Sequence, residues 1–409
     1  DMASATQAND LDKYSSKPPV LDIDPYSDDF LLDPYPYHEA LREAGGVVWL
    51  PKYETWAVAR FQEMQECLKD FDTFCSSAGV GLANFKHEKP FRPPSIVLEA
   101  DPPDHTRARG VIGRAMSQKA VTNLIQAFED DADTILDKLV ARQDIDGMQD
   151  LAIAYPLKVF PDAVGIEEKG RENLLIYGNM VFNAVGPRNK NFEKAANEYA
   201  AVSEWIMRHC ERDAIHPGGF GEAIFAGADN GDITEEEAGM LVRSLLTAGI
   251  DTTVAAIGNA LLAFAENPSE WEKLHADPTL AKQAFEEVLR YDGVVQSFFR
   301  TTTKEVEIDG VTLGAYEKVL IFFGAGNRDP RRWEEPDTFN ITRPVHAHLA
   351  FGTGIHRCVG QRVAQIEGEI ILRKLAERVK RIELTGKPKR RLNNAIRVLD
   401  ELPLKLVAA

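Results

Sequence analysis

One long apolar segment sets the dimensions of any fold that this chain can adopt. Thr234 and the acidic residues 235–237 are a typical helix start, and the helical pattern then continues for about nine turns. Residues 241–265 are long enough to cross a membrane, but Arg243 and Asp251 interrupt the first half of this stretch. We therefore expect a buried helix that crosses the whole molecule, and no membrane partner.

The remaining sequence predicts a mainly α-helical fold with a small β lobe. From about residue 103 to residue 266, apolar side chains recur at spacings of three and four, which is the period of an amphipathic helix. Strand-like segments occur at about 47–60 and 303–323. The predicted class is therefore a helical lobe joined to a minor sheet.

Charge and cysteine content narrow the possible partners. The chain has 47 Lys and Arg against 64 Asp and Glu, so its net charge of −17 opposes nucleic-acid binding. Its four cysteines form no CxxC pair, and no basic segment precedes an apolar one at the N-terminus, which favours a reducing cytoplasm. No linker divides the chain, so we expect a single domain at 25–409. We also expect an extended or disordered tail at 1–24, and a monomer.

The most specific motif is the glycine-rich loop FGTGIHRCVG at residues 351–360, which contains Cys358. A thiolate that binds haem iron needs a loop whose backbone can approach the porphyrin, and three glycines supply positions without a Cβ. Amides of the loop and of the following helix can stabilise the negative sulfur. The loop does not complete a dinucleotide-binding GxGxxG motif, because Arg357 occupies the third glycine position.

A second motif, AGIDTT at residues 248–253, lies in the middle of the long helix. The pair Asp251 and Thr252 is costly inside an apolar helix unless its groups are satisfied or functional. A threonine alone could simply bond to a carbonyl one turn earlier, but the pair favours a catalytic role. Gly249 lowers helix stability by about 1 kcal/mol relative to Ala, and it leaves room for a local bulge where oxygen and water fit.

Together with residues 101–109 (DPPDHTRAR) and 287–290 (EVLR), these motifs resemble the cytochrome P-450 superfamily over about residues 22–406. The resemblance implies the cytochrome P-450 fold, with a long central distal helix and a proximal loop that carries the cysteine ligand. It also implies a monooxygenase that activates dioxygen on haem b. Cys358 would bind the iron, Thr252 would hydrogen-bond to bound oxygen, and Asp251 would relay protons.

The same resemblance suggests further contacts with haem. Its propionates would be held by His105, Arg109, Arg300 and His348. The remaining expected cofactor contacts are Phe351, Gly352, Ala248 and Gly249. Glu287 and Arg290 are expected to be buried in a salt-bridged network with a later arginine, Arg343, and to serve the fold.

The residues near the expected oxygen site suggest an aromatic acid as substrate. Four of them are polar, namely Arg92, Ser95, Arg243 and Ser244, and could bind a carboxylate. The apolar remainder would be Leu98, Phe182, Val185, Ala248, Val295, Phe298 and Ile396. The chain resembles the bacterial subfamily that oxidises para-substituted benzoates, including O-demethylation of 4-methoxybenzoate. Family members carry a Phe where this chain has Val185, which predicts a wider site.

Electrons would have to come from separate proteins, because the sequence contains no flavin, nicotinamide or iron–sulfur motif. We expect a ferredoxin and an NAD(P)H-dependent ferredoxin reductase, with docking near Cys358 through Arg107, Arg114, Arg357 and Arg362. Three alternatives remain open at this point. One is a hydroxylase of a bulkier terpenoid, macrolide or fatty acid, and another is a non-catalytic haem sensor, which would not need Asp251 and Thr252. The third is a peroxide-driven haem-thiolate enzyme, which would more naturally have other residues in place of this pair.

Overall fold

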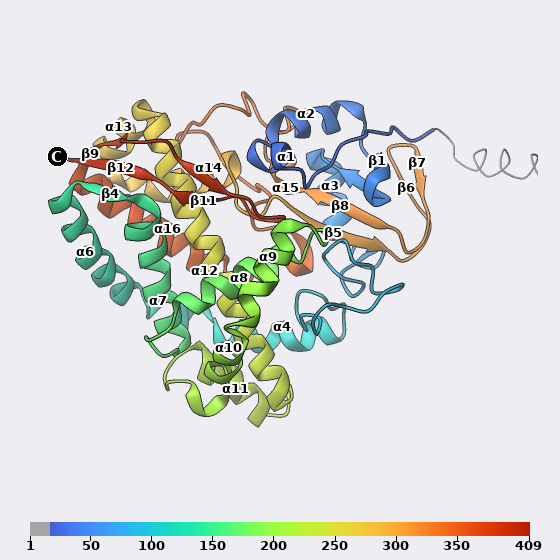
Figure 1. Cartoon of the computed structure of the whole chain (residues 1–409), viewed down its shortest axis with the longest axis horizontal. Helices are drawn as coiled ribbons and strands as arrows, with labels where there is room; N and C mark the ends of the chain where they lie inside the picture. Colours follow the sequence, from blue (N-terminus) through green and yellow to red (C-terminus); the bar gives the residue numbers. More distant parts are fainter. Residues whose placement is uncertain (1–16) are drawn as a thin grey trace, which may run out of the picture.

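The predicted long helix is α12, Glu235–Glu266, in a computed structural model that describes residues 17–409. Its start is a capping box, in which Thr234 Oγ1 accepts from the Glu237 amide and Glu237 Oε1 accepts from the Thr234 amide, each at 3.0 Å. The helix is apolar enough to pass for a membrane span, but 83% of its most apolar window is buried inside the protein. Figure 1 shows α12 passing through the middle of the molecule.

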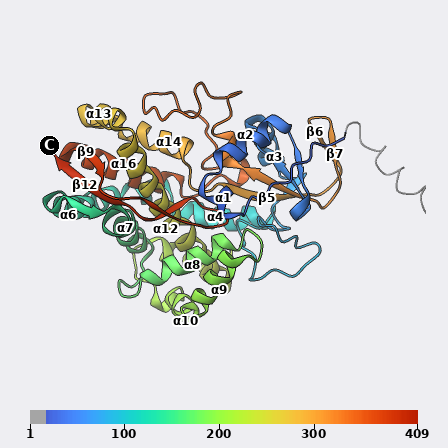
Figure 2. The same ribbon diagram turned by 45° about the horizontal axis from the view of Figure 1, so that its top comes forward.

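Helices pack around α12 on several sides. It contacts α7, α8, α11, α13, α14 and α16, and Figure 2 shows α8, α9 and α10 together along one face of the molecule. A helix that is apolar on all sides needs such a complete shell. The helices before α12 are α1 (Asp28–Leu32), α2 (Tyr35–Ala44), α3 (Phe61–Lys69), α4 (Asp104–Ala115), α5 (Gln118–Thr122), α6 (Ile125–Arg142), α7 (Ala154–Val164), α8 (Glu172–Asn183), α9 (Lys190–Ala200), α10 (Ser203–His209) and α11 (Phe220–Asp229). Those after it are α13 (Pro268–Ala276), α14 (Ala281–Tyr291), α15 (Phe323–Gly326) and α16 (Gln361–Arg378).

The predicted small β lobe is a mixed sheet with the strand order β1-β2-β8-β5-β3 within the described residues. Its strands are β1 (Val48–Leu50), β2 (Thr55–Val58), β8 (Lys318–Phe322), β5 (Ser297–Thr302) and β3 (Phe74–Cys75). Strand β2 runs parallel to β8, and β5 is antiparallel to β8. The sequence-based boundary at residue 303 misses β5, because five of its six residues are buried and the polar-apolar alternation of a half-exposed strand is absent.

Further strands lie outside this sheet. The hairpin of β6 (Val306–Ile308) and β7 (Val311–Leu313) falls within the predicted β lobe. The C-terminal strands β9 (Val379–Leu384), β10 (Lys389–Arg391), β11 (Val398–Glu401) and β12 (Pro403–Ala408) were not predicted, and neither was β4 (Asp144–Asp146). Strand β12 pairs with both β4 and β9, so the chain end is anchored in a sheet.

The expected N-terminal tail is described only in part. Residues 1–16 lie outside the described residues. Residues 17–24 run beside β1, where the Leu21 amide donates to the Trp49 carbonyl at 3.1 Å and the Trp49 amide donates to the Pro19 carbonyl at 2.8 Å. This part of the tail is therefore extended and hydrogen-bonded to the edge of the sheet.

The expected buried ion-pair network is confirmed. Glu287 of α14 is fully buried and accepts from Arg290 Nε at 2.5 Å and from Arg343 Nε at 2.9 Å. Both guanidinium groups also donate to backbone carbonyls, among them the Thr338 carbonyl. Because its charges are paired and hydrogen-bonded, the network fixes the irregular chain that leads to the cysteine loop.

Candidate active site

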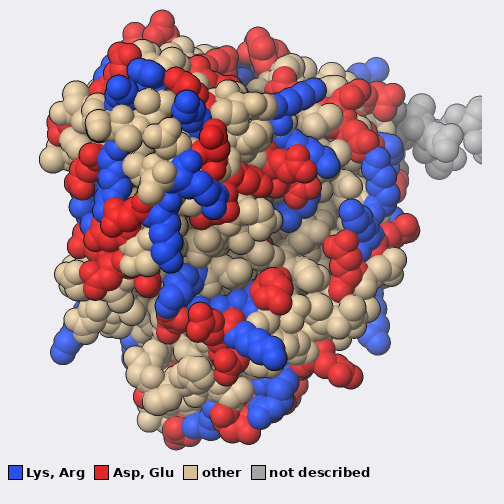
Figure 3. Space-filling model, turned by 60° about the vertical axis from the view of Figure 1, so that its left-hand side comes forward, with Lys and Arg blue, Asp and Glu red and all other residues tan. Residues whose placement is uncertain are grey.

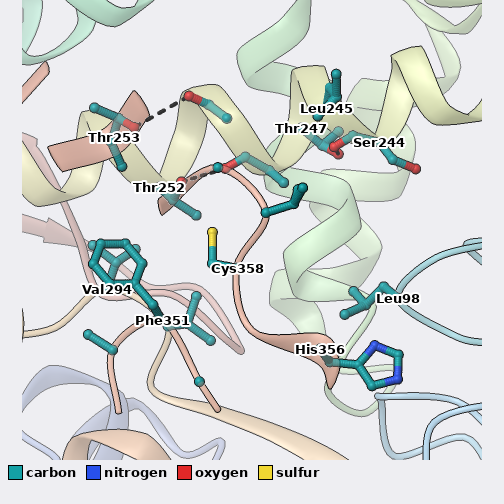
Figure 4. Close-up of a pocket in the computed structure, with 18 of the residues that line it drawn as sticks. Leu98, Ser244, Leu245, Thr247, Thr252, Thr253, Val294, Phe351, His356 and Cys358 are labelled. Atoms are coloured by element: carbon teal, nitrogen blue, oxygen red, sulfur yellow. Dashed lines mark hydrogen bonds between the residues drawn. The ribbon is translucent and has the colours of Figure 1, made fainter. Parts of the chain in front are cut away.

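A cavity of about 280 Å³ lies between α12 and the cysteine loop, residues 351–360. Figure 4 shows the sulfur of Cys358 pointing across this cavity towards α12, with Thr252 on the facing side. Most of the predicted cofactor contacts line the cavity, namely Cys358, Arg109, Arg300, Phe351, Gly352, Ala248 and Gly249. The two central motifs of the sequence therefore meet across one internal space.

The conformation of the cysteine loop explains its glycines. Gly352 and Gly354 have φ angles of +68° and +77°, which side chains disfavour, and a Cβ on Gly354 would lie 2.6 Å from the Leu68 carbonyl. Cys358 is accessible because it faces the cavity. Burial raises the pKa of its thiol, whereas the Gly360 amide and Arg109 act in the opposite direction. The loop thus presents a sulfur to the cavity beside hydrogen-bond donors and positive charge.

Thr252 lines the cavity, and its hydroxyl donates to the Ala248 carbonyl at 2.5 Å. This is the local bond that a threonine alone would be expected to make. Asp251, the other member of the pair, does not line the cavity. It is 2% exposed, and its Oδ2 has no hydrogen-bond partner within residues 17–409.

The carboxylate of Asp251 instead points at α8. A Cβ on Gly178 would lie only 1.2 Å from Asp251 Oδ2, so the glycine is what allows this close approach. Burial raises the pKa of Asp251 to about 7, and Arg391 acts in the opposite direction. A carboxyl group with this pKa can both hold and release a proton near neutral pH.

Gly249 requires a correction. The whole of α12 is α-helical, so the expected local bulge is absent from this described helix. A Cβ on Gly249 would instead lie 2.4 Å from two ring atoms of Phe160 on α7. Close packing of α12 against α7 is therefore the physical reason for this glycine.

One end of the cavity is cationic. Arg300 is 4% exposed, and the one hydrogen bond that it makes among the described residues is from Nη1 to the Phe299 carbonyl at 2.9 Å. His356 lines the cavity beside it, and its ring centroid lies 4.3 Å from that of His105. Nε2 is buried without a partner in both imidazoles. Burial lowers the pKa of Arg300 to about 10 and that of His356 to about 3.

These residues fit haem b. A buried arginine without a carboxylate and two orphaned imidazole nitrogens are the partners that haem carboxylates require. Arg109 on α4 lines the same cavity, one helical turn after His105, which does not line the cavity itself but contacts the lining residue His356. Cys358 would hold the iron, while His105, Arg109, Arg300 and His356 would hold the carboxylates.

His348 does not belong to this group, which corrects the prediction for it. It is absent from the cavity lining, and its Nε2 pairs with Glu286 of α14. Its Nδ1 accepts from the Ala350 amide at 3.2 Å. Both nitrogens of the His348 imidazole are therefore already hydrogen-bonded within the protein. The histidine that lines the cavity is His356, two residues before Cys358, which was not predicted from the sequence.

Most of the predicted substrate contacts also line the cavity, namely Arg92, Ser95, Leu98, Phe182, Ser244, Ala248, Val295 and Phe298. Arg243, Val185 and Ile396 do not line it. Val185 lies beyond the end of α8, where its carbonyl accepts from the Leu82 amide at 2.8 Å, and the expectation that it widens the site stays a prediction. Ile396 forms a β-bridge with Val295, which lines the cavity.

Tyr177 of α8 lines the cavity and was not predicted. It is 9% exposed and stacks on Tyr199 with ring centroids 5.3 Å apart. Burial raises the pKa of Tyr177, whereas Arg92 and Arg243 both act to lower it. Both guanidinium groups therefore lie close to this hydroxyl, although only Arg92 reaches the cavity.

Comparison with known proteins agrees with this geometry. Residues 220–406 match the family described as Cytochrome P450. The chain is 52% identical to cytochrome p450 CYP199A2 of Rhodopseudomonas palustris over 392 residues, which cover 96% of this chain and 95% of the relative. It is 30% identical to the cytochrome P450 monooxygenase PikC of Streptomyces venezuelae, over 96% of this chain and 95% of the relative.

A solved structure extends the comparison to the fold. CYP109E1 from Bacillus megaterium, in complex with testosterone, superposes with a TM-score of 0.83 at 25% identity, covering 93% of this chain and 99% of that chain. The likeness in sequence and in fold agrees with the cysteine-lined cavity. The chain belongs to the cytochrome P450 family of monooxygenases, which bind haem b through a cysteine thiolate.

Proposed function

We propose that this cytochrome P450 oxidises an aromatic carboxylic acid, and that it O-demethylates 4-methoxybenzoate or a close alkoxybenzoate. The observation that supports this is Arg92, which lines one end of the cavity without a carboxylate partner among the described residues and, like Arg243, lies close to the Tyr177 hydroxyl. The one hydrogen bond that Arg92 makes among the described residues is to the neighbouring Pro93 carbonyl at 3.4 Å, and Arg243 has no ion-pair partner in the same part of the chain. A buried carboxylate would pair with such cations.

Hydroxyl groups lie at the same end. Ser95 is 8% exposed, and its Oγ accepts from the Leu98 amide at 3.1 Å, which leaves the hydroxyl proton to donate to a carboxylate. Ser244 and Tyr177 line the same cavity. Hydrogen bonds to a charged group are the strong ones, so these donors would fix the orientation of an acid.

The rest of the cavity suits a flat ring. Leu98, Phe182 and Phe298 supply apolar walls, and the small Ala248 lies one helical turn from Thr252. A ring held at its carboxylate by Arg92 would direct its para substituent towards the space between Thr252 and Cys358. The proposed substrate therefore has its reactive group opposite its acid group.

When bound, haem supplies the iron on which dioxygen is activated and one oxygen atom passes to the substrate. Insertion of that atom into a methyl C–H bond of the ether would give a hemiacetal, which would split into the phenol and formaldehyde. Two electrons and two protons convert the second oxygen atom to water. For proton supply, Thr252 offers a hydroxyl in the cavity and Asp251 a carboxyl group with a pKa of about 7.

The electrons would come from a ferredoxin and its NAD(P)H-dependent reductase. Of the predicted docking cations, Arg107 and Arg114 are already paired with Glu237 and Asp232. The side-chain partners of Arg357 and Arg362 among residues 17–409 are the neutral Gln361 and Thr122. These two arginines are therefore the better candidates for an acidic partner.

The face where α6 meets α16 carries charges of both signs, and its described residues therefore offer no cationic patch for such a partner (Figure 3). On the face where α6 meets α16, Arg378 pairs with Asp133 and Asp137. Figure 3 shows Lys and Arg side chains interspersed with Asp and Glu over the face that includes these helices. Interspersed charges of this kind do not form a strong single-sign field.

Optical titration of the haem-loaded protein tests the proposed substrate. 4-Methoxybenzoate should shift the haem towards high spin, whereas the neutral 4-methoxytoluene should bind about tenfold or more weakly. Arg92→Ala should weaken binding of the acid to a similar extent. Arg188→Ala is the matched control, because Arg188 stacks on Phe91 and Phe192 outside the cavity lining. Equal binding of ether and acid would instead favour a larger hydrophobic substrate.

A further inference from the structure

Five asparagines connect helix α8 to a loop near the C-terminus. This asparagine network consists of Asn179 and Asn183 on α8, Asn189 between α8 and α9, and Asn393 and Asn394 between β10 and β11. Asn183, Asn393 and Asn394 are 1%, 3% and 2% exposed. Such buried amides are tolerated because they satisfy one another.

The hydrogen bonds join three parts of the chain. The backbone N–H of Asn394 donates to Asn183 Oδ1 at 2.9 Å. The side-chain Nδ2 of Asn394 donates to the backbone carbonyl of Asn183 and to Asn189 Oδ1, each at 3.0 Å. Asn189 Nδ2 returns a bond to Asn394 Oδ1 at 2.8 Å. Asn393 Nδ2 donates to Asn179 Oδ1 at 3.0 Å. The end of α8, the start of α9 and the loop are thereby fixed to one another.

The contact between the loop and the α8–α9 connection is close. A Cβ on Gly186 would lie 2.7 Å from Asn394 Cβ, so only glycine allows Asn394 to approach at this point. Asn189 Oδ1 also caps α9 by accepting from the Phe192 amide at 3.1 Å. Because several bonds converge on Asn394, its loss would weaken the network at more than one place.

Other residues of α8 line the active-site cavity, namely Tyr177, Val181 and Phe182. Phe182 directly precedes Asn183 on α8, so a shift of the helix at Asn183 would move the aromatic ring as well. On the far side of the loop, Asn393 Oδ1 accepts from the Ile396 amide at 3.1 Å, and Ile396 pairs with the cavity residue Val295. The network is thus one residue from the cavity on α8 and one β-bridge from it on the loop.

We propose that the asparagine network positions α8, and with it Phe182, and so determines which ring substituent of the substrate reaches the haem. A buried polar interface specifies one arrangement, because a shifted register would leave amides without partners. The part of the proposal that concerns ring position rests on the proposed aromatic-acid substrate. The part that concerns α8 does not.

The first test therefore uses no substrate. In the haem-loaded protein, Asn394→Ala should increase hydrogen–deuterium exchange of the α8 amides about tenfold, which corresponds to the loss of one or two net hydrogen bonds. Gly186→Ala should have the same effect by forcing Asn394 away. Asn327→Ala is the control, since Asn327 is 1% exposed and accepts from the Leu349 amide at 2.7 Å, away from α8 and the loop. If α8 exchanges no faster in Asn394→Ala than in Asn327→Ala, the proposal is wrong.

The second test measures ring selectivity. The ratio of the dissociation constants of 3-methoxybenzoate and 4-methoxybenzoate should change by about fivefold or more in Asn394→Ala, and should stay at the parent value in Asn327→Ala. An unchanged ratio together with faster α8 exchange would overturn the role of the network in selectivity. If neither acid binds to the parent enzyme, the proposed function fails, while the exchange experiment still decides whether the network holds α8.

Discussion

The imidazoles of His105 and His356 lie with their ring centroids 4.3 Å apart, each leaves Nε2 buried without a partner among the described residues, and His356 lines the active-site cavity. The two rings come from α4 and from the cysteine loop, which are far apart in sequence. Their contact, together with the unpaired Arg300, identifies the end of the cavity where the haem carboxylates would bind.

His356→Ala is therefore expected to release haem faster than the parent. Loss of one hydrogen bond to a buried carboxylate corresponds to about a ten- to hundredfold faster release. Transfer of haem to an excess of an apo-globin, followed optically, measures this rate. His348→Ala removes an imidazole that pairs with Glu286 outside the cavity, so its haem release should stay close to that of the parent. The reverse order of the two variants would restore His348 as the haem partner.

The choice between these histidines shows what the sequence could not decide. Both precede Cys358 within ten residues, and either could reach a propionate from an irregular loop. The difference arises from Glu286, whose carboxylate binds His348, and from the turn at Gly354, which places His356 in the cavity wall. Neither the pairing of His348 with Glu286 nor the position of His356 after the turn can be recognised from a local sequence pattern.

Other parts of the structure were predictable because local chemistry decides them. The cap at Thr234 and the apolar run after it define α12, and the cysteine loop is defined by its own glycines. The buried network of Glu287 and its arginines, in contrast, was predicted only from the family resemblance, because such a pair on a helix is usually solvated. The side chain of Asp251 points at Gly178, and that orientation depends on how α8 packs on α12. Tertiary packing of this kind leaves no periodic pattern to read.

Thr252→Ala should uncouple the enzyme. Without its hydroxyl in the cavity, less of the reducing power should reach product and more should appear as hydrogen peroxide, with product per NAD(P)H lowered by about tenfold or more. Substrate affinity should change little. Thr134→Ala on α6 is the matched control, because Thr134 makes the same bond to a carbonyl four residues earlier, at 3.1 Å, far from the cavity. Unchanged yield in Thr252→Ala would make Thr252 an ordinary helix residue.

Arg343→Ala should destabilise the fold strongly. It would leave Glu287, which is fully buried, with one fewer cation, and breaking such a pair costs about 3–5 kcal/mol. Arg381 pairs with Glu383 on the surface, where both side chains are about half exposed, so Arg381→Ala should cost less than about 1 kcal/mol. Urea unfolding of the two haem-loaded variants compares them, and similar midpoints would mean that the buried network contributes little.

Gly249→Ala distinguishes close packing from helix propensity. An alanine at an open helical position gains up to about 1 kcal/mol, as expected for Gly113→Ala in α4, where a Cβ meets nothing within 4 Å. At Gly249 the Cβ would strike Phe160, and overpacking costs about 1–3 kcal/mol, so Gly249→Ala should lower the melting temperature. The double variant with Phe160→Leu should recover part of the loss. A stabilised Gly249→Ala would show that α12 has space at this point.

Asp251 and Asp292 should have opposite effects on stability, although both are buried. The pKa of Asp251 is about 7 in the folded protein and about 3.9 in an unfolded chain, so the unfolded state loses its proton first as the pH rises. Asp251 therefore becomes progressively destabilising between about pH 4 and pH 7, and its cost stays constant above that range. Asp251→Asn should gain about a third as much stability at pH 5 as at pH 8, where the gain should be roughly a few kcal/mol.

Asp292 pairs with Arg390 at 3.0 Å and with Arg397 at 2.6 Å, and these cations outweigh burial and hold the pKa of its carboxyl group well below the usual range. A lowered pKa contributes stability that is present above the unfolded-state value and is lost as the pH falls through the folded-state value. Asp292→Asn should therefore destabilise the protein at pH 7, the reverse of Asp251→Asn. Urea unfolding from pH 5 to pH 8 tests both signs in one series. If the change in unfolding free energy caused by Asp251→Asn varied with pH no more than that caused by Asp292→Asn, Asp251 Oδ2 would have a hydrogen-bond donor in solution. The stability gain expected from Asp251→Asn would then be absent.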